Sequence, residues 1–345
     1  MPVNNSKMPG LHIPPVIMGT TALGNLFKAL GENEKCALVE EYIRCSEKPA
    51  VFDSAGKYGA GLSLEVLSKC LKKLNVPLED VIISNKLAWV RTELTTPEPT
   101  FEPGAWKDIK FDAVQRISYK GILECFEQGN QLLNGYIPQM VSVHDPDEYL
   151  AKAQNEAEEK ALYNDILEAY GALADLKKQG RVTAIGVGAK KWRSIEKISR
   201  DVDLDWVMIA NSMTIKTHPK ELLDFMQSLE DKNIFIINSA VFHSGFLLGG
   251  EYFDYKLVDA ASEENKALLQ WREDFFALCN EYAIKPAEAC VQFGMSAPGV
   301  KSIAFSTSEP ERIKENMDMA TAKIPAGFWK AMKEKGLIQP YYSCL

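Results

Sequence analysis

The sequence predicts an α/β fold, a (β/α)8 TIM barrel in which parallel strands close into a ring and each strand is followed by a helix. Eight short apolar runs alternate with longer amphipathic segments, which is the pattern of a parallel sheet. Eight such units are the number found in a closed barrel. On pattern alone an open doubly wound sheet is the alternative, but no Gly-x-Gly-x-x-Gly turn follows the first run. We therefore expect residues 1–345 to form a single barrel domain.

The expected strands are the short apolar runs, and each is expected to lie in the wall of the barrel. In chain order they are residues 14–18, 50–52, 81–84, 139–143, 182–187, 206–210, 234–238 and 302–305.

The segments between these runs have the apolar spacing of amphipathic helices. Ser63 is expected to cap the second helix, Gly180 to end the fourth, and Ser308 with Glu311 to form a capping box at the last. In chain order the expected helices are residues 32–47, 63–74, 118–133, 158–179, 192–200, 218–231, 263–282, 286–297 and 309–320.

Three long insertions follow predicted strands. They are residues 87–117, 145–157 and 245–262. Barrel enzymes carry their variable active-site loops at the carboxyl ends of the strands. We therefore expect enlarged loops on that face of the barrel.

The composition excludes two classes of partner. The chain has 39 Lys and Arg against 47 Asp and Glu, a formal net charge of −8. This acidic balance argues against a nucleic-acid-binding protein, which needs a basic surface. It argues equally against a polybasic protein of the membrane surface.

The cysteines and the N-terminal segment predict a cytoplasmic protein. The seven cysteines are widely spaced, with no Cys-x-x-Cys pair, and most lie in apolar segments, so we expect reduced, buried thiols. The N-terminal segment is polar and rich in proline, without the apolar stretch of a signal peptide. No apolar run approaches the ~20 residues that span a bilayer.

Four residues of complementary chemistry follow consecutive strands. Asp53 comes directly after the second strand, Lys86 after the third and His144 after the fourth, and Tyr58 lies in the same loop as Asp53. In a barrel these side chains converge on one mouth. Each has a structural alternative when taken alone, since Asp53 suits a turn, Lys86 a surface charge and His144 a helix entry.

Together the four residues predict proton chemistry at a C–O centre. A tyrosine has a pKa of about 10, and a nearby ammonium lowers it, so Tyr58 becomes a usable acid or base. His144 would orient the same oxygen. No metal-ligand spacing, nucleophile elbow or glycosidase-type carboxylate pair is present, so we expect no metal and a nicotinamide as hydride acceptor. A Schiff-base role for Lys86 in an aldolase is a further alternative.

Several segments resemble the motifs of the aldo-keto reductase superfamily. They are MGTTALGNLF (18–27), FDSAGKYGAGLSLEVL (52–67), SNKLAW, VSVHDPD, SAVFHSGFLLGG (239–250) and STSEPERIKEN (306–316). The resemblance implies a (β/α)8 barrel with a catalytic tetrad of Asp53, Tyr58, Lys86 and His144. Within the superfamily the chain is most similar to the branch of L-fucose and D-threo-aldose 1-dehydrogenases.

The resemblance also implies an extended nicotinamide dinucleotide across the mouth. Gly245 permits close backbone approach, and the helix after Ser308 favours an anion. The implied cofactor residues are Gly19, Thr20, Thr21, Asp53, Asn211, Asn238, Ser239, Val241, Phe242, Ser244, Gly245, Ser306, Thr307, Arg312 and Asn316.

Two departures from the family pattern bear on the cofactor. Ala304 and Phe305 stand where NADP-preferring relatives have a basic residue, which favours NAD, although Arg312 leaves NADP open. Gly188 and Ala189 replace a common Ser-Asn pair, so Asn211 becomes the candidate for the carboxamide.

The preferred reaction is oxidation of a small-molecule aldose, L-fucose-like, at C1 to the lactone. Trp89 is the first candidate to stack on the sugar, followed by Tyr149 and Trp192, and plain core or rim positions are the alternative for each. The alternatives for the function are an NADPH-dependent reductase of aldehydes or ketones and a cofactor-bound regulatory subunit.

Overall fold

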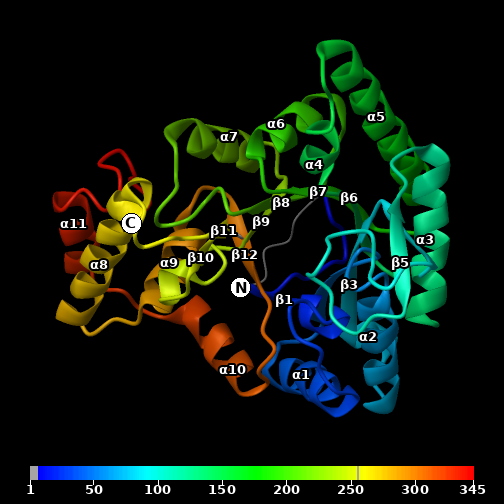
Figure 1. The fold of residues 1–345 in the computed structure, drawn as a ribbon, viewed down its shortest axis with the longest axis horizontal. Helices are drawn as coiled ribbons and strands as arrows, with labels where there is room; N and C mark the ends of the chain where they lie inside the picture. Colours follow the sequence, from blue (N-terminus) through cyan, green and yellow to red (C-terminus); the bar gives the residue numbers. More distant parts are fainter. Residues whose placement is uncertain (1–6, 255) are drawn as a thin grey trace.

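The barrel is closed by eight parallel strands (Figure 1), as expected from the sequence. The computed structural model describes residues 7–254 and 256–345. Around the ring the order is β1-β12-β9-β8-β7-β6-β3-β2, and β1 closes it by pairing with both β2 and β12. The strands are β1 Val16–Gly19, β2 Ala50–Ala55, β3 Val81–Leu87, β6 Met140–His144, β7 Ala184–Ala189, β8 Trp206–Ala210, β9 Phe235–Ser239 and β12 Val300–Phe305.

Helices surround this ring on the outside (Figure 1). The α-helices are α1 Glu32–Cys45, α2 Leu62–Lys73, α3 Tyr119–Leu133, α4 Pro146–Leu150, α5 Glu156–Lys178, α6 Trp192–Asp201, α7 Lys220–Asp231, α8 Lys266–Glu281, α9 Pro286–Ser296, α10 Glu311–Asp318 and α11 Ala326–Glu334. Short 3₁₀ turns are η1 Thr21–Gly24, η2 Leu78–Asp80, η3 Phe246–Leu248, η4 Glu263–Asn265 and η5 Met319–Thr321. Within the described part of the chain, no helix combines the length and the apolar character that a bilayer span requires.

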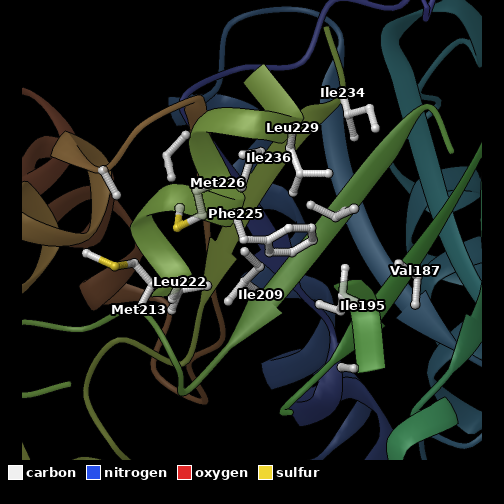
Figure 2. Close-up of a cluster of buried hydrophobic side chains, with 14 of the residues drawn as sticks. Val187, Ile195, Ile209, Met213, Leu222, Phe225, Met226, Leu229, Ile234 and Ile236 are labelled. Carbon is white, nitrogen blue, oxygen red and sulfur yellow. The ribbon is translucent and has the colours of Figure 1, made fainter. Parts of the chain in front are cut away.

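Alternate residues of the strands serve two cores, because successive side chains point to opposite faces of a strand. Inside the ring, Trp206 is fully buried in a cluster to which Ile17, Val51 and Phe235 also belong. Gly186 on the neighbouring strand makes room for it, since a Cβ there would lie 2.2 Å from the indole ring. Outside the ring, the other face of the strands packs against the helices, and Figure 2 shows side chains of α7 facing Ile209 and Ile236 of β8 and β9.

Two of the three predicted caps are wrong. Helix α2 begins at Leu62 after Gly61, and the Ser63 hydroxyl instead donates to the carbonyl oxygen of Thr20 at 2.9 Å. Helix α10 begins at Glu311 after Pro310 without a side-chain cap, so Ser308 and Glu311 form no capping box. Gly180 is confirmed, since its φ of +70° ends the turn after α5.

All three long insertions follow strands and contain structure that the sequence pattern did not predict. The first holds an antiparallel hairpin of β4 Trp89–Glu93 and β5 Phe111–Gln115. The second holds α4, and the third a small hairpin of β10 Tyr252–Phe253 and β11 Lys256–Leu257.

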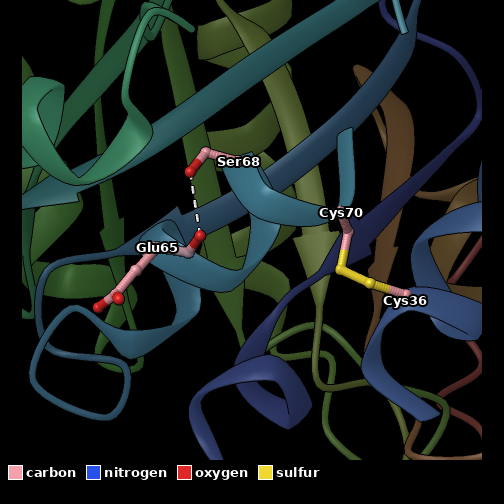
Figure 3. Close-up of a disulfide and its surroundings, with 4 residues drawn as sticks. All are labelled: Cys36, Glu65, Ser68 and Cys70. Atoms are coloured by element: carbon pink, nitrogen blue, oxygen red, sulfur yellow. Dashed lines mark hydrogen bonds between the residues drawn. A yellow bond between two sulfur atoms is a disulfide. The ribbon is translucent and has the colours of Figure 1, made fainter. Parts of the chain in front are cut away.

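The expectation that all cysteines are reduced is wrong for one pair. Cys36 of α1 and Cys70 of α2 form a disulfide across two neighbouring helices, with their Cα atoms 5.2 Å apart (Figure 3). The Ser68 hydroxyl, drawn beside it, donates to the Glu65 carbonyl within α2. A separation of 34 residues carries no pairing signal in a sequence, because only the packing of α1 on α2 brings the two thiols together.

Candidate active site

The four predicted catalytic residues lie together at the carboxyl ends of neighbouring strands. Register places Lys86 of β3 beside Ala55 of β2 and beside Ser142 of β6, so that Asp53, Lys86 and His144 share one mouth. All three are buried, each 4 % exposed. Tyr58 follows β2, with its ring centroid 4.8 Å from the Lys86 Nζ and 5.6 Å from the His144 ring.

The Asp53 carboxylate is ion-paired with Lys86. One carboxylate oxygen is ion-paired with the Lys86 ammonium, and the other accepts a hydrogen bond from the Ser84 hydroxyl at 3.1 Å. Its backbone carbonyl accepts from the Thr20 hydroxyl. A buried charge pair of this kind needs such hydrogen bonds to offset its loss of hydration. The ammonium is therefore fixed beneath the Tyr58 ring.

His144 is held as a neutral imidazole. Burial lowers its pKa well below the usual range, and the nearby ammonium groups of Lys57, Lys86 and Lys190 act in the same direction. Its Nε2 lies 3.5 Å from the Asp145 carboxylate. Among the described residues, its Nδ1 has no hydrogen-bond partner. A neutral imidazole has one N–H to donate and one nitrogen to accept.

A second buried lysine, missed in the sequence analysis, lies next to the tetrad. Lys57 is 3 % exposed, and its Nζ lies 2.7 Å from Glu102, 3.3 Å from Glu148 and 3.4 Å from Asp145. Burial opposes the charged form, but the carboxylates outweigh it and raise the pKa of Lys57. Its position directly before Tyr58 was the available signal, whereas Glu102 lies in an insertion without a motif.

An aromatic wall, formed by Trp89, Phe101 and Trp106, continues from the Tyr58 ring. The Trp106 ring lies 5.8 Å from Tyr58, and Phe101 lies between Trp106 and Trp89 at 6.3 and 5.8 Å. Phe101 and Trp106 are buried, and Trp89 is half-buried. Sequence analysis found only Trp89 of these three, because Trp89 follows Lys86 closely, whereas Phe101 and Trp106 lie deeper in the 87–117 insertion, where no motif marks them.

The other two substrate candidates contact helices α5 and α7. The Tyr149 hydroxyl donates to Asp165 of α5 at 2.7 Å. The Trp192 ring stacks on Phe225 of α7, 5.8 Å between centroids. Both side chains therefore hold helices together on the outside of the barrel, and neither joins the tetrad.

The candidates for the cofactor fall into two groups around the mouth. The first lies where β1 meets β12, and there the Thr21 and Ser306 hydroxyls are hydrogen bonded to each other at 2.7 Å. Gly19 is close to β12, since a Cβ would lie 3.1 Å from the Phe305 carbonyl oxygen. Farther along, Arg312 at the start of α10 is exposed and paired with Glu309, and Asn316 is half-buried on the same helix.

The second group is the loop after β9, and part of it is taken up by the fold. The Asn238 amide donates to the carbonyls of Met213 and Gly294, while its oxygen accepts from the Ser239 amide. Val241 belongs to a buried apolar cluster, and Phe242 stacks on Phe305 at 5.6 Å. The side chains of Asn238 and Val241 are therefore structural.

The remaining groups of this region suit a nicotinamide dinucleotide. Asn211 follows β8 with φ +59°, and among the described residues its buried Oδ1 has no hydrogen-bond partner. Such an acceptor fits the amide N–H of a carboxamide. At Gly245, with φ +88°, an added Cβ would meet nothing within 4 Å, so the backbone there is open to a close approach.

Residues 15–336 match the sequence profile of the aldo/keto reductase family. The chain belongs to that family. The chain is therefore an oxidoreductase acting on CH–OH or carbonyl groups, and aldo/keto reductases use nicotinamide cofactors.

Three curated relatives are similar to this chain along most of their length. Pyridoxal 4-dehydrogenase of Microbacterium luteolum is 27% identical, covering 95% of this chain and 96% of its own. D-threo-aldose 1-dehydrogenase of a Pseudomonas species is 26% identical with the same coverage. L-galactose dehydrogenase of Arabidopsis thaliana is 24% identical, covering 90% of this chain and 86% of its own.

Solved structures show the same aldo/keto reductase fold. An aldo-keto reductase from Bacillus halodurans in its holo form superposes with a TM-score of 0.68 at 15% identity, covering 95% of this chain and 93% of its own. The glycerol dehydrogenase of Gluconobacter oxydans gives a TM-score of 0.69 at 14% identity, covering 95% and 92%.

Proposed function

We propose that the protein oxidises the anomeric C–OH of an aldose, L-fucose-like in kind, to the lactone, with NAD as the preferred cofactor. The observation that carries this proposal is the buried Asp53–Lys86 pair beneath Tyr58, with neutral His144 beside it. The similarity to a D-threo-aldose 1-dehydrogenase over 95% of the chain supports an aldose as the substrate.

In the proposed reaction, each residue of the tetrad has its own role in removing the proton from the C1 hydroxyl. Tyr58 takes the proton of the C1 hydroxyl as general base, and the Lys86 ammonium stabilises the phenolate form that accepts it. Asp53 keeps Lys86 in place. The neutral His144 hydrogen-bonds the same substrate oxygen and orients it. The bound nicotinamide supplies the site that accepts the hydride from C1.

The aromatic wall would hold the ring of the substrate. A pyranose presents C–H faces that pack on flat aromatic rings. Trp89 is the half-buried member of this wall, whereas Trp106 is buried against Tyr58. The wall also favours a second candidate, an aromatic aldehyde whose neighbouring hydroxyl closes it to a hemiacetal. A relative named pyridoxal 4-dehydrogenase, 27% identical, supports that candidate. The reaction would be the same oxidation of a cyclic hemiacetal.

The preference for NAD rests on charge around the β12 end. Ala304 and Phe305 offer no cation for a 2′-phosphate, and the exposed Arg312 is already paired with Glu309. A 2′-phosphate would have to compete with that carboxylate for the guanidinium.

A substrate panel tests this function. Initial rates are measured for L-fucose, D-arabinose, L-galactose and pyridoxal with NAD and with NADP, and for aldehyde reduction with NADPH. We expect lactone formation from an aldose to be fastest, with NAD. Faster NADPH-dependent reduction of simple aldehydes would contradict the proposal, and so would turnover of pyridoxal alone.

A further inference from the structure

Lys57 is the centre of an ion-pair cluster that joins separate segments around Tyr58. It lies in the loop between β2 and α2, and its carboxylate partners come from two other places. Glu102 belongs to the loop 94–110 between β4 and β5, whereas Asp145 and Glu148 belong to the turn and helix after β6. The Lys57 ammonium is distinct from that of Lys86, which is ion-paired with Asp53.

Glu102 connects Lys57 to the aromatic wall, because its carboxylate contacts both Lys57 and Trp106. Its Oε1 lies 2.7 Å from the Lys57 Nζ, and its Oε2 accepts a hydrogen bond from the Trp106 Nε1 at 2.8 Å. Both carboxylate oxygens are thus used, one on each side. The Trp106 ring in turn lies 5.8 Å from the Tyr58 ring.

The loop 94–110 is also attached to β5 and to the turn after β1. The Thr100 hydroxyl donates to the Asp112 carboxylate of β5 at 2.7 Å. The Phe27 amide donates to the Ala105 carbonyl at 2.7 Å, and the Lys107 amide to the Asn25 carbonyl at 3.0 Å. Leu26 and Trp106 form an isolated bridge. None of these contacts reaches Lys57, and Glu102 supplies the ion pair that links this loop to Lys57 beside the tetrad.

We propose that Lys57 is a positioning residue, which holds the loop 94–110 over the mouth through Glu102 and so places Trp106 beside Tyr58 as a wall of the substrate site. That Trp106 is a wall of the substrate site rests on the proposed function. That Lys57 holds the loop 94–110 rests on the contacts alone.

The first experiment compares Glu102→Ala with Glu98→Ala, an exposed carboxylate in the same loop. Trypsin cleavage after Lys107 and Lys110 is followed by mass spectrometry on the whole protein. We expect cleavage on the order of tenfold faster in Glu102→Ala and unchanged in Glu98→Ala, because a loop held by one or two kcal/mol opens more often by about that factor. Equal protection in both variants would overturn the proposal.

The second readout separates positioning from chemistry. In Glu102→Ala we expect KM for the substrate to rise on the order of tenfold with kcat nearly unchanged, since only the closed fraction of molecules binds well. Glu98→Ala should keep both constants. A fall in kcat with an unchanged KM would overturn the positioning role.

The third experiment measures activity as a function of pH in Lys57→Met, Glu102→Ala and wild type. His144 faces the ammonium groups of Lys57, Lys86 and Lys190, the carboxylates of Asp145 and Glu148, and the Tyr58 ring. Removing Lys57 leaves those carboxylates less balanced and favours imidazolium, so activity should fall at acid pH in this variant and not in Glu102→Ala. Identical profiles in Lys57→Met and wild type would contradict this coupling. If wild type oxidises no compound of the panel, the proposed function fails. The trypsin comparison, extended to Lys57→Met, still decides whether the Lys57–Glu102 ion pair holds the loop 94–110.

Discussion

The ring of Tyr58 is surrounded by a cation, an imidazole and an indole. The Lys86 ammonium lies 4.8 Å from its ring centroid, the neutral His144 stands edge-on at 5.6 Å, and Trp106 covers a further side at 5.8 Å. Under the proposed function, the Tyr58 hydroxyl is the group that exchanges a proton with the substrate oxygen. The Asp53–Lys86 ion pair and the Ser84 hydrogen bond to Asp53 do not involve that hydroxyl.

Tyr58→Phe should therefore reduce kcat by about 10²- to 10⁴-fold, the usual contribution of general acid–base catalysis. Cofactor affinity, followed by quenching of tryptophan fluorescence, should change little because the ring is kept. Tyr149→Phe is the matched control, since it removes a phenol hydroxyl that bonds Asp165. A Tyr58→Phe enzyme with most of its activity would refute the proton-transfer role.

At the scale of elements, two contacts attach helices or segments that are distant in sequence. The Cys36–Cys70 disulfide joins α1 to α2, and His218, ahead of α7, joins the C-terminal segment to the barrel. Its Nε2 accepts a hydrogen bond from the Gln339 amide at 3.0 Å, so its proton is on Nδ1, which donates to the Thr214 carbonyl. The ring also packs on Phe293 and Tyr342.

Removing the disulfide should destabilise the protein without disabling it. A cross-link that closes a loop of this length stabilises by about 4 kcal/mol, mainly by restricting the unfolded chain. We expect Cys36→Ser with Cys70→Ser to lower the free energy of unfolding in urea by about that amount, with kcat retained. Dithiothreitol should lower the wild-type stability toward the same value and leave the double variant unchanged; no effect on wild type would contradict the cross-link.

His218 should make stability depend on pH. Burial lowers its pKa to about 4, whereas in the unfolded chain it titrates near 6.5. As pH falls from about 6.5 to about 4, His218 binds a proton in the unfolded chain but stays neutral in the folded protein. The contribution of His218 to stability is therefore fully present above this pH window and declines within it. At pH 5 the difference of about 1.5 pH units corresponds to about 2 kcal/mol.

Urea unfolding at pH 7.5 and at pH 5 checks this dependence. We expect wild type to lose about 2 kcal/mol more than His218→Gln between these two conditions. Any contribution of His144 has the same sign and is present in both proteins, so it cancels in the comparison. An equal loss in the two proteins would show that His218 is not the group responsible.

At the scale of the whole molecule, the ring is organised around the indole of Trp206. Gly186 and Gly188 are two residues apart on β7, yet only the first faces that indole closely. A Cβ on Gly186 would lie 2.2 Å from the Trp206 ring, whereas a Cβ on Gly188 would meet nothing nearer than 3.6 Å.

Gly186→Ala should accordingly lower the free energy of unfolding by about 3 kcal/mol, the upper part of the range for overpacking a core. Gly188→Ala, on the same strand, should change it by less than about 1 kcal/mol. Thermal and urea unfolding of the pair measures the difference. Similar stabilities would show that the barrel interior adjusts around Trp206 more freely than its packing indicates.

The sequence predicts the features that depend on neighbouring residues in the chain, such as strands and the residues at their ends. The eight strands were predicted from short apolar runs, and Asp53, Lys86 and His144 from their places directly after such runs. Glu102 and Trp106 were missed because their partners are far along the chain. Ser63 and Ser308 suited helix caps by spacing, but the Thr20 contact and Pro310 decided otherwise.

The closure of the ring by β1 has a consequence for how the protein is made. Val16 pairs with Ile303, so almost the whole chain must leave the ribosome before the first strand finds its second partner. Until then β1 and β9 present open edges, which other chains can join. Contacts of such long sequence separation also form slowly. Synthesis that stalls before residue 300 should thus yield an aggregation-prone fragment with most of its helices and no barrel.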